Sequence, residues 1–324
     1  MGRRYGIIGR PLGHSFSPRY FGDKFRREGI DARYDRFELQ DIDEVGRLLE
    51  EHPALVGFNV TIPYKQQIIP LLSALSPEAA AIGAVNCVRV ERPADGSPRL
   101  TGYNTDARGF RQSLLEFIPG LAPTLGQEGQ ATEENNPVCP TGMAARSSRF
   151  PRPDSEMGLE VSPENGIDGQ LPPGSPFPPH PTPKPAGITG ALVLGNGGAA
   201  RAVRYVLETL GIPHLTVSRH PRGEGEIGYP DIDGALLDSH PLLVNTTPLG
   251  MSPNTGTCPD LPYALLGPRH YLHDLVYNPE MTEFLLRGAR QGAHVRNGLR
   301  MLYLQADESW RIWTSAPLRQ EISE

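Results

Sequence analysis

The chain has few cysteines, no long apolar run and no excess of basic charge. Its three cysteines, Cys87, Cys139 and Cys258, lie far apart and form no CxxC pair, which argues against a disulfide framework and a zinc site. No apolar run approaches the roughly 20 residues that cross a bilayer, and residues 1–6 begin no signal peptide. With 31 Lys and Arg against 37 Asp and Glu, the chain offers no basic surface for nucleic acid. We therefore expect a cytoplasmic protein with no metal and no nucleic-acid or membrane partner.

Proline is distributed unevenly among the 324 residues. Of 34 prolines, 15 lie between Pro119 and Pro185, a segment without Trp or Tyr. Proline cannot continue a helix or pair within a central strand, and so few apolar side chains cannot offset the entropy of ordering the segment. We expect a long disordered Pro-rich insertion at about residues 119–186. An idle surface loop is the favoured interpretation, and a PxxP-type ligand for a partner domain is the alternative.

Both flanks of the insertion alternate short apolar strands with helices. The pattern predicts strands at 4–8, 33–38, 56–60, 190–194, 215–218, 242–245 and 271–274, and helices at 18–28, 42–51, 65–75, 108–117 and 199–210. Such alternation is typical of an α/β protein with parallel sheets and helices on their faces. The length is consistent with two domains.

A glycine-rich turn follows the strand at 190–194. Residues 195–201 are Gly-Asn-Gly-Gly-Ala-Ala-Arg, so an apolar strand, a Gly-x-Gly-x-x-Ala turn and a helix follow one another as in dinucleotide sites. The glycines permit a tight turn and close approach of a pyrophosphate, which the free N–H groups of the helix would receive. The predicted cofactor contacts of this turn are Gly195, Asn196, Gly197, Gly198, Ala199 and Ala200.

The end of the next strand indicates which dinucleotide binds. An NAD site places Asp or Glu about 20 residues past the first glycine, for the ribose 2′-hydroxyl. Residues 216–222 are instead Thr-Val-Ser-Arg-His-Pro-Arg. Arg219, with Arg222, can pair with a 2′-phosphate, and no carboxylate lies in this stretch to repel it. We therefore predict NADP(H) as cofactor; the alternative is a pair of solvated loop arginines.

Four polar clusters lie at strand ends or loops in the first 110 residues. They span residues 13–18, 57–65, 82–86 and 102–106. Each alone has an ordinary structural explanation, since Ser15, Ser17 or Asp106 could simply cap a helix. Together they point to a polar site.

These clusters, the turn at 195–201, and the segments 245–251, 274–279 and 298–305 resemble the shikimate dehydrogenase family. They follow that family's order and cover nearly the whole chain except the insertion. The resemblance implies NADPH-dependent, reversible reduction of 3-dehydroshikimate to shikimate, on the way to chorismate and the aromatic amino acids. It also implies a substrate domain of residues 1–105, completed by 299–324, and a Rossmann-type NADP-binding domain of residues 106–298 that contains the insertion. A monomer and a homodimer both stay open.

The resemblance also implies roles for the matching positions. Lys65 and Asp106 would be the catalytic pair, with the lysine ammonium stabilising and protonating the ketone oxygen. The remaining positions would bind substrate or cofactor. Substrate would be bound by Ser15, Ser17, Asn59, Thr61, Asn86, Tyr277 and Gln305, and the cofactor also by Ser218, Asn245, Thr246, Thr247, Gly298 and Met301.

The chain departs from the family pattern at several positions besides the insertion, and two other functions compete with the one that the resemblance implies. Phe16 stands between the serines where Leu is common, and Ser218 precedes Arg219 where Asn is more usual. One alternative is a quinate/shikimate dehydrogenase that uses both NAD and NADP, against which Arg219 argues. The other is a non-catalytic shikimate-binding regulatory protein, against which the presence of both Lys65 and Asp106 argues.

Overall fold

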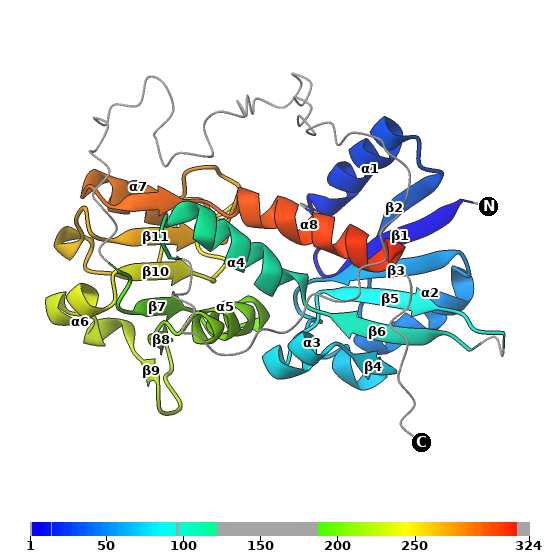
Figure 1. Ribbon diagram of the computed structural model, residues 1–324, viewed down its shortest axis with the longest axis horizontal. Helices are drawn as coiled ribbons and strands as arrows, with labels where there is room; N and C mark the ends of the chain where they lie inside the picture. The colour runs from blue at the N-terminus through cyan, green and yellow to red at the C-terminus, as the bar shows by residue number, and fades with distance from the viewer. Residues whose placement is uncertain (1, 14, 95–96, 122–186, 316–324) are drawn as a thin grey trace.

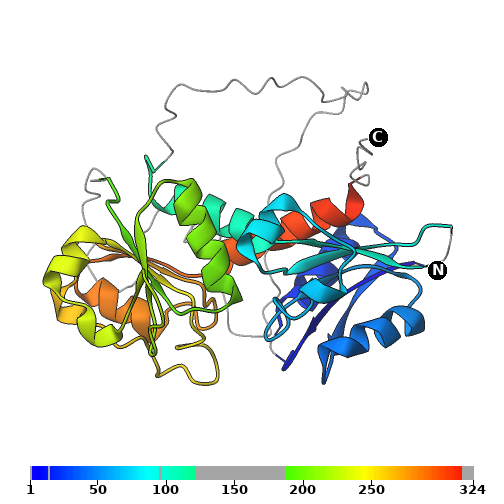
Figure 2. The same cartoon turned by 90° about the horizontal axis from the view of Figure 1, so that it is seen from below.

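The computed structural model describes residues 2–13, 15–94, 97–121 and 187–315. Apart from residues 119–121, the expected Pro-rich insertion lies outside the described residues. The described chain forms two six-stranded sheets, one at each end of the molecule (Figure 1). Helices α4 (Thr105–Phe117) and α8 (Leu299–Thr314) run between them, which the view from below also shows (Figure 2).

The first sheet has the strand order β2-β1-β3-β5-β6-β4. Strands β1 (Arg3–Gly9), β2 (Ala32–Glu38) and β3 (Leu55–Val60) are parallel, as are β4 (Ala74–Leu75) and β6 (Arg99–Tyr103). Strand β5 (Cys87–Glu91) runs antiparallel to β3 and β6. The first sheet is therefore mainly parallel, as expected, but β5 departs from this because the chain between β5 and β6 is too short for a crossover connection.

Three helices accompany this sheet, and one predicted helix is absent. They are α1 (Ser17–Glu28), α2 (Val45–Glu51), which follows the 3₁₀ turn Ile42–Glu44, and α3 (Pro77–Ile82). The helix predicted at 65–75 was wrong, since turns, the 3₁₀ helix Ile69–Leu71 and β4 occupy this stretch. Pro70 lacks an N–H and disfavours a continuous helix. The helix begins later, where the Ser76 hydroxyl accepts a hydrogen bond from the N–H of Ala79 at 3.1 Å.

The second sheet is wholly parallel, as expected, with the order β12-β11-β10-β7-β8-β9. Its strands are β7 (Ala191–Leu194), β8 (His214–Val217), β9 (Glu226–Ile227), β10 (Leu242–Asn245), β11 (Tyr271–Asp274) and β12 (His294–Arg296). Helices α5 (Gly198–Thr209), α6 (Gly234–Ser239) and α7 (Glu283–Arg290) and 3₁₀ turns at Tyr229–Asp231 and Tyr263–Leu265 connect them. The strand order reverses between β7 and β10, and ligands of doubly wound sheets bind at such a point.

Helices α4 and α8 pack against each other and join the two halves. Phe110 and Leu114 of α4 share a buried cluster with Val203 of α5. At the far end of α8, the indole of Trp313 packs in the first sheet's aromatic cluster and donates to the Val88 carbonyl at 3.0 Å. The last helix thus returns to the first sheet and contributes side chains there.

In the described part of the chain, we find no helix with the length and apolar character needed to span a bilayer. Within the same residues, no three His, Cys, Asp or Glu side chains gather as metal ligands.

Strand β11 carries a fully buried histidine, His273. Its Nε2 lies 3.1 Å from the Ser113 hydroxyl, and the rings of Phe110 and Phe117 pack around it. Burial, together with the charge of Arg296, lowers the pKa of His273 to about 3. The unfolded chain takes up a proton here near pH 6.5 and the folded chain does not, so stability falls as the pH drops below about 6.5.

We predict that the unfolding free energy of His273→Gln falls less between pH 7 and pH 5 than that of the native chain, by about 2 kcal/mol. The glutamine amide can still reach Ser113 but does not titrate. Urea unfolding at both pH values measures this difference, with the exposed His220→Gln as control. Equal pH-dependent losses in the native chain and His273→Gln would contradict the assignment.

Candidate active site

Lys65 and Asp106 form a direct pair. The Lys65 Nζ donates to Asp106 Oδ2 at 2.6 Å, and the two side chains are only 17% and 9% exposed. Lys65 lies in the turns after β3, and Asp106 lies in the first turn of α4. The α4 cap is Asn104, whose side chain accepts from the N–H of Ala107 at 3.1 Å. Asp106 is therefore available for a role other than capping.

The amide of Asn86 fixes the other side of this pair. Its Nδ2 donates to Asp106 Oδ1 and to the Thr105 hydroxyl, both at 2.9 Å. Its Oδ1 accepts from the backbone N–H of Thr105 at 2.6 Å. Both carboxylate oxygens of Asp106 thus have a partner, and the carboxylate plane is fixed relative to Lys65.

The hydrogen-bonded network continues from Asn86 to Asn59. The Asn59 Nδ2 donates to the backbone carbonyl of Asn86 at 3.1 Å and to the Ser309 hydroxyl at 3.0 Å. Ser309 in turn donates to the Gln305 carbonyl at 2.9 Å, and the Thr105 hydroxyl donates to Gln305 Oε1 at 3.4 Å. Helix α8 therefore places Gln305 beside the predicted substrate residues. Thr61 also belongs to this side, since it lies two residues past Asn59 at the end of β3.

One face of β2 supports the serine loop, a feature that the sequence reasoning missed. Tyr34 donates to Asn59 Oδ1 at 2.8 Å and also hydrogen-bonds to the side chain of Ser17. The Arg36 guanidinium donates to the Ser15 carbonyl at 3.2 Å. Glu38, two residues further, accepts from the N–H of Leu12 at 3.1 Å. Residues two apart on a strand share a face, but Arg33 and Asp35 make the other face of β2 polar as well, so no alternating pattern marked this face in the sequence.

Tyr277 reaches the serine loop from the second sheet. It follows β11, and its ring centroid lies 6.1 Å from that of Phe16. Burial raises the pKa of Tyr277, and a hydrogen bond with the Phe16 backbone opposes this. The hydroxyl therefore stays protonated at neutral pH. Phe16 also contacts the ring of Tyr303 on α8 at 5.4 Å.

The glycine turn fits a dinucleotide phosphate. Gly195 has a φ of +107°, and a Cβ there would lie 2.8 Å from the Thr246 hydroxyl. Gly197 is the N-cap of α5, and a Cβ there would meet nothing within 4 Å. The first N–H groups of a helix have no partner within the helix, so Gly198, Ala199 and Ala200 present donors for an anion.

The two halves of the predicted site meet at Lys65. A Cβ at Gly198 would lie 3.3 Å from the Cβ and Cδ atoms of Lys65. The predicted catalytic lysine therefore packs against the predicted cofactor turn, which brings the two sets of residues together.

Other predicted cofactor residues have contacts that hold the surrounding chain in place. Asn245 is fully buried, donates to Asp274 Oδ1 at 3.0 Å, and accepts from the Thr247 hydroxyl at 2.7 Å. Burial raises the pKa of Asp274 to about 6. Met301 packs in the core beside Phe110. Gly298 begins α8, where a Cβ would lie 2.1 Å from the Leu275 carbonyl oxygen.

A carboxylate on β9 lies beside the arginine-bearing loop that follows β8. Arg219 and Arg222 are exposed, and Ser218 accepts from the N–H of His220 at 3.2 Å. The sequence reasoning found no carboxylate in residues 216–222. In the structure Glu226, on β9, accepts from the Arg222 N–H at 3.0 Å and from Asn196 Nδ2 at 2.8 Å.

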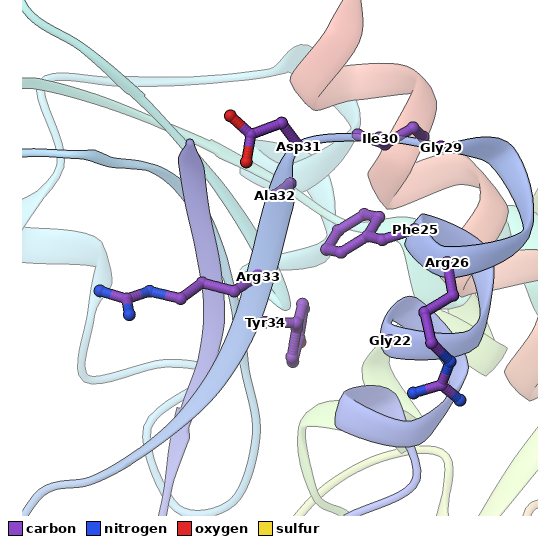
Figure 3. Close-up of a pocket in the computed structure, with 9 residues that line it drawn as sticks. All are labelled: Gly22, Phe25, Arg26, Gly29, Ile30, Asp31, Ala32, Arg33 and Tyr34. Carbon is purple, nitrogen blue, oxygen red and sulfur yellow. The ribbon is translucent and has the colours of Figure 1, made fainter. Parts of the chain in front are cut away.

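A pocket of about 520 Å³ lies elsewhere, between α1 and β2 (Figure 3). None of the residues predicted from the sequence lines it. Its walls are Gly22, Phe25, Arg26, Gly29, Ile30, Asp31, Ala32, Arg33 and Tyr34. Tyr34 is shared with the network, since its hydroxyl reaches Asn59.

We predict that Tyr34→Phe lowers the unfolding free energy by about 1–3 kcal/mol, because it leaves the buried Asn59 amide oxygen without its donor. Tyr205→Phe on α5 is the matched control and should change it by less than about 0.5 kcal/mol. Urea unfolding of both variants measures the difference. A neutral Tyr34→Phe would remove Tyr34 from the supporting network.

Residues 7–88 match the sequence model of the shikimate dehydrogenase substrate binding domain. A shikimate dehydrogenase (NADP(+)) of Desulforamulus reducens is 29% identical over 95% of this chain and 89% of its own. One of Caldicellulosiruptor saccharolyticus is 27% identical over 95% and 90%.

Solved structures agree with these matches. Shikimate dehydrogenase from Aquifex aeolicus has a TM-score of 0.67 and 27% identity, covering 98% of this chain and 94% of that one. Shikimate 5-dehydrogenase from Thermus thermophilus, in complex with NADP(H) and shikimate, has a TM-score of 0.65 and 27% identity, covering 96% and 93%. The order of the motifs, the domain match and the two-sheet architecture agree in making the chain similar to shikimate dehydrogenases over most of its length.

Proposed function

We propose that this chain catalyses the NADPH-dependent, reversible reduction of 3-dehydroshikimate to shikimate in aromatic amino acid biosynthesis. The observation that carries the proposal is the Lys65–Asp106 pair, 2.6 Å between Nζ and Oδ2, packed against the glycine turn at Gly198. The relatives named shikimate dehydrogenase (NADP(+)) match this chain over most of its length, which supports the same substrate and cofactor.

A nicotinamide held at residues 195–200 would supply a hydride to the ketone carbon, and the ketone oxygen would then need a proton. We assign the proton to Lys65, whose ammonium has three N–H groups and gives only one of them to Asp106. Its positive charge also stabilises the negative charge that develops on the ketone oxygen. Asp106 cannot turn away from the lysine, because Asn86 holds its second oxygen.

The polar network would select the substrate. We assign the substrate carboxylate to the hydroxyls of Ser15 and Ser17; the Arg36 guanidinium, which donates to the Ser15 backbone carbonyl, adds positive charge to this loop. The side chains of Asn59, Thr61, Asn86 and Gln305 would surround the ring hydroxyls, and the protonated Tyr277 would donate from the second sheet. Because these groups are held by one another, a substrate that lacks a matching hydroxyl would leave them unpaired, which costs binding energy.

The proposed domain division follows the two sheets. Residues 1–105 and 299–324 would bind substrate, since α8 returns to the first sheet at Trp313. Residues 106–298 would bind the cofactor, since α4 packs on α5. A cytoplasmic location, a homodimer and a partner domain for residues 119–186 stay predictions from the sequence.

Initial rates at 340 nm with shikimate or quinate, and with NADP or NAD, test the function. We expect the highest kcat/KM with shikimate and NADP. High activity with quinate and NAD would favour the dual-specificity alternative. Saturable shikimate binding without turnover in any pairing would make the chain a binding protein.

In the same assay, which runs as shikimate oxidation, Lys65→Ala should lower kcat by several hundredfold or more, because the group that exchanges the proton with the substrate oxygen is lost. Lys24→Ala on α1, where the lysine pairs with Glu28, is the control and should keep the native rate. Near-native turnover of Lys65→Ala would rule out its role as proton donor.

Arg219→Ala should raise the KM for NADPH far more than the KM for NADH, because only NADPH has the 2′-phosphate. Arg290→Ala, at the exposed end of α7, controls for the loss of one positive charge. Equal effects of Arg219→Ala on the two cofactors would show that Arg219 does not bind the 2′-phosphate.

A further inference from the structure

Glu226 is held between the two parts of the predicted adenosine site. Its Oε1 accepts from Nδ2 of Asn196, the second residue of the glycine turn, at 2.8 Å. Its Oε2 accepts from the backbone N–H of Arg222, on the arginine-bearing loop after β8, at 3.0 Å. The carboxylate therefore bridges the phosphate turn and the loop that carries Arg219 and Arg222.

The position of Glu226 is fixed by the sheet and by a second layer of contacts. Glu226 begins β9, which pairs in parallel with β8 so that Glu226 lies opposite Thr216. The guanidinium of Arg204 donates to Asn196 Oδ1 at 2.8 Å and to the Thr216 hydroxyl at 3.2 Å. Asn196 is thus oriented with its amide N–H toward Glu226. The carboxylate side chain is not a freely moving surface group.

A carboxylate at this place affects the two nicotinamide dinucleotides in opposite ways. The adenosine ribose binds beyond the carboxyl end of the second strand of such a sheet, which is β8 here. A 2′-phosphate is strongly anionic, so a nearby carboxylate repels it and competes with it for the arginines. A ribose 2′-hydroxyl can instead donate to that carboxylate. Arg219 favours NADP, whereas Glu226 favours NAD.

We propose that Glu226 is a specificity-determining residue that limits how strongly this chain prefers NADP over NAD. The inference shares one premise with the proposed function, namely that a nicotinamide dinucleotide binds at residues 195–200. Glu226 reaches the site from another strand than the one on which NAD-binding sites place their acidic residue. The charge balance of the site therefore depends on β9 as well as on the loop after β8.

The test measures dissociation constants of NADP⁺ and NAD⁺ by titration calorimetry without substrate. Glu226→Gln keeps the size of the side chain and an acceptor for Asn196 but removes the charge. It should lower the dissociation constant of NADP⁺ and raise that of NAD⁺. The ratio of the NAD⁺ constant to the NADP⁺ constant should therefore rise on the order of tenfold. The gain for NADP⁺ should shrink at high salt.

Two further variants separate charge from support. Glu224→Gln removes an exposed charge two residues away and should change the ratio by less than about twofold. Glu226→Ala removes both the charge and the contact with Asn196, so it should raise the ratio while weakening both cofactors. If Glu226→Gln leaves the ratio unchanged and Glu226→Ala weakens both cofactors equally, Glu226 is only a support for Asn196 and the inference is wrong.

The binding readout keeps this inference separate from the proposed function. A shifted ratio without shikimate turnover would support Glu226 and overturn the proposed reaction. Normal turnover with an unchanged ratio of dissociation constants in Glu226→Gln would overturn the proposed role of Glu226 and leave the proposed reaction standing. If the native chain binds neither dinucleotide, both are overturned.

Discussion

The arrangement of the two halves depends on one buried amide, the side chain of Asn86. It stands immediately before β5 and hydrogen-bonds to the Thr105 backbone and to Asp106, at the start of α4. A buried amide is costly unless its donors and acceptor are paired. This junction pairs all of them, and the same contacts fix the direction in which α4 leaves the first sheet and the position of the carboxylate that meets Lys65.

Close contacts across the junction then place the predicted substrate residues against the predicted cofactor residues. Gly198 packs on the Lys65 side chain, and a Cβ at Gly83 would lie 3.2 Å from the Arg201 guanidinium of α5. Phe16 and Tyr277 meet across the same junction. Glycines at these points let α5 approach the first sheet closely. A reaction that needs an ammonium beside the transferred hydride requires such proximity.

Local signals explain which sequence-based expectations were confirmed. The second sheet, its glycine turn and helix α5 were predictable because each depends on adjacent residues, namely apolar strands, a glycine that must adopt positive φ, and a good helix former after it. The helix expected at 65–75 failed because Pro70 and the competing β4 pairing outweighed the apolar spacing. The antiparallel β5 was missed because strand direction depends on connection length, which apolar patterns do not encode.

The sequence by itself determined the α/β alternation and the glycine turn, and it predicted the likeness to shikimate dehydrogenases and the pairing of Lys65 with Asp106, since motif order and local backbone preference carry that information. Tertiary structure alone decided which polar side chains meet. Asn59 and Ser309 are 250 residues apart, yet their side chains are hydrogen-bonded. Tyr34 and Glu226 likewise act on residues from other strands or loops. Such contacts leave no local pattern, because hydrogen-bond partners are chosen by the three-dimensional packing of strands and helices.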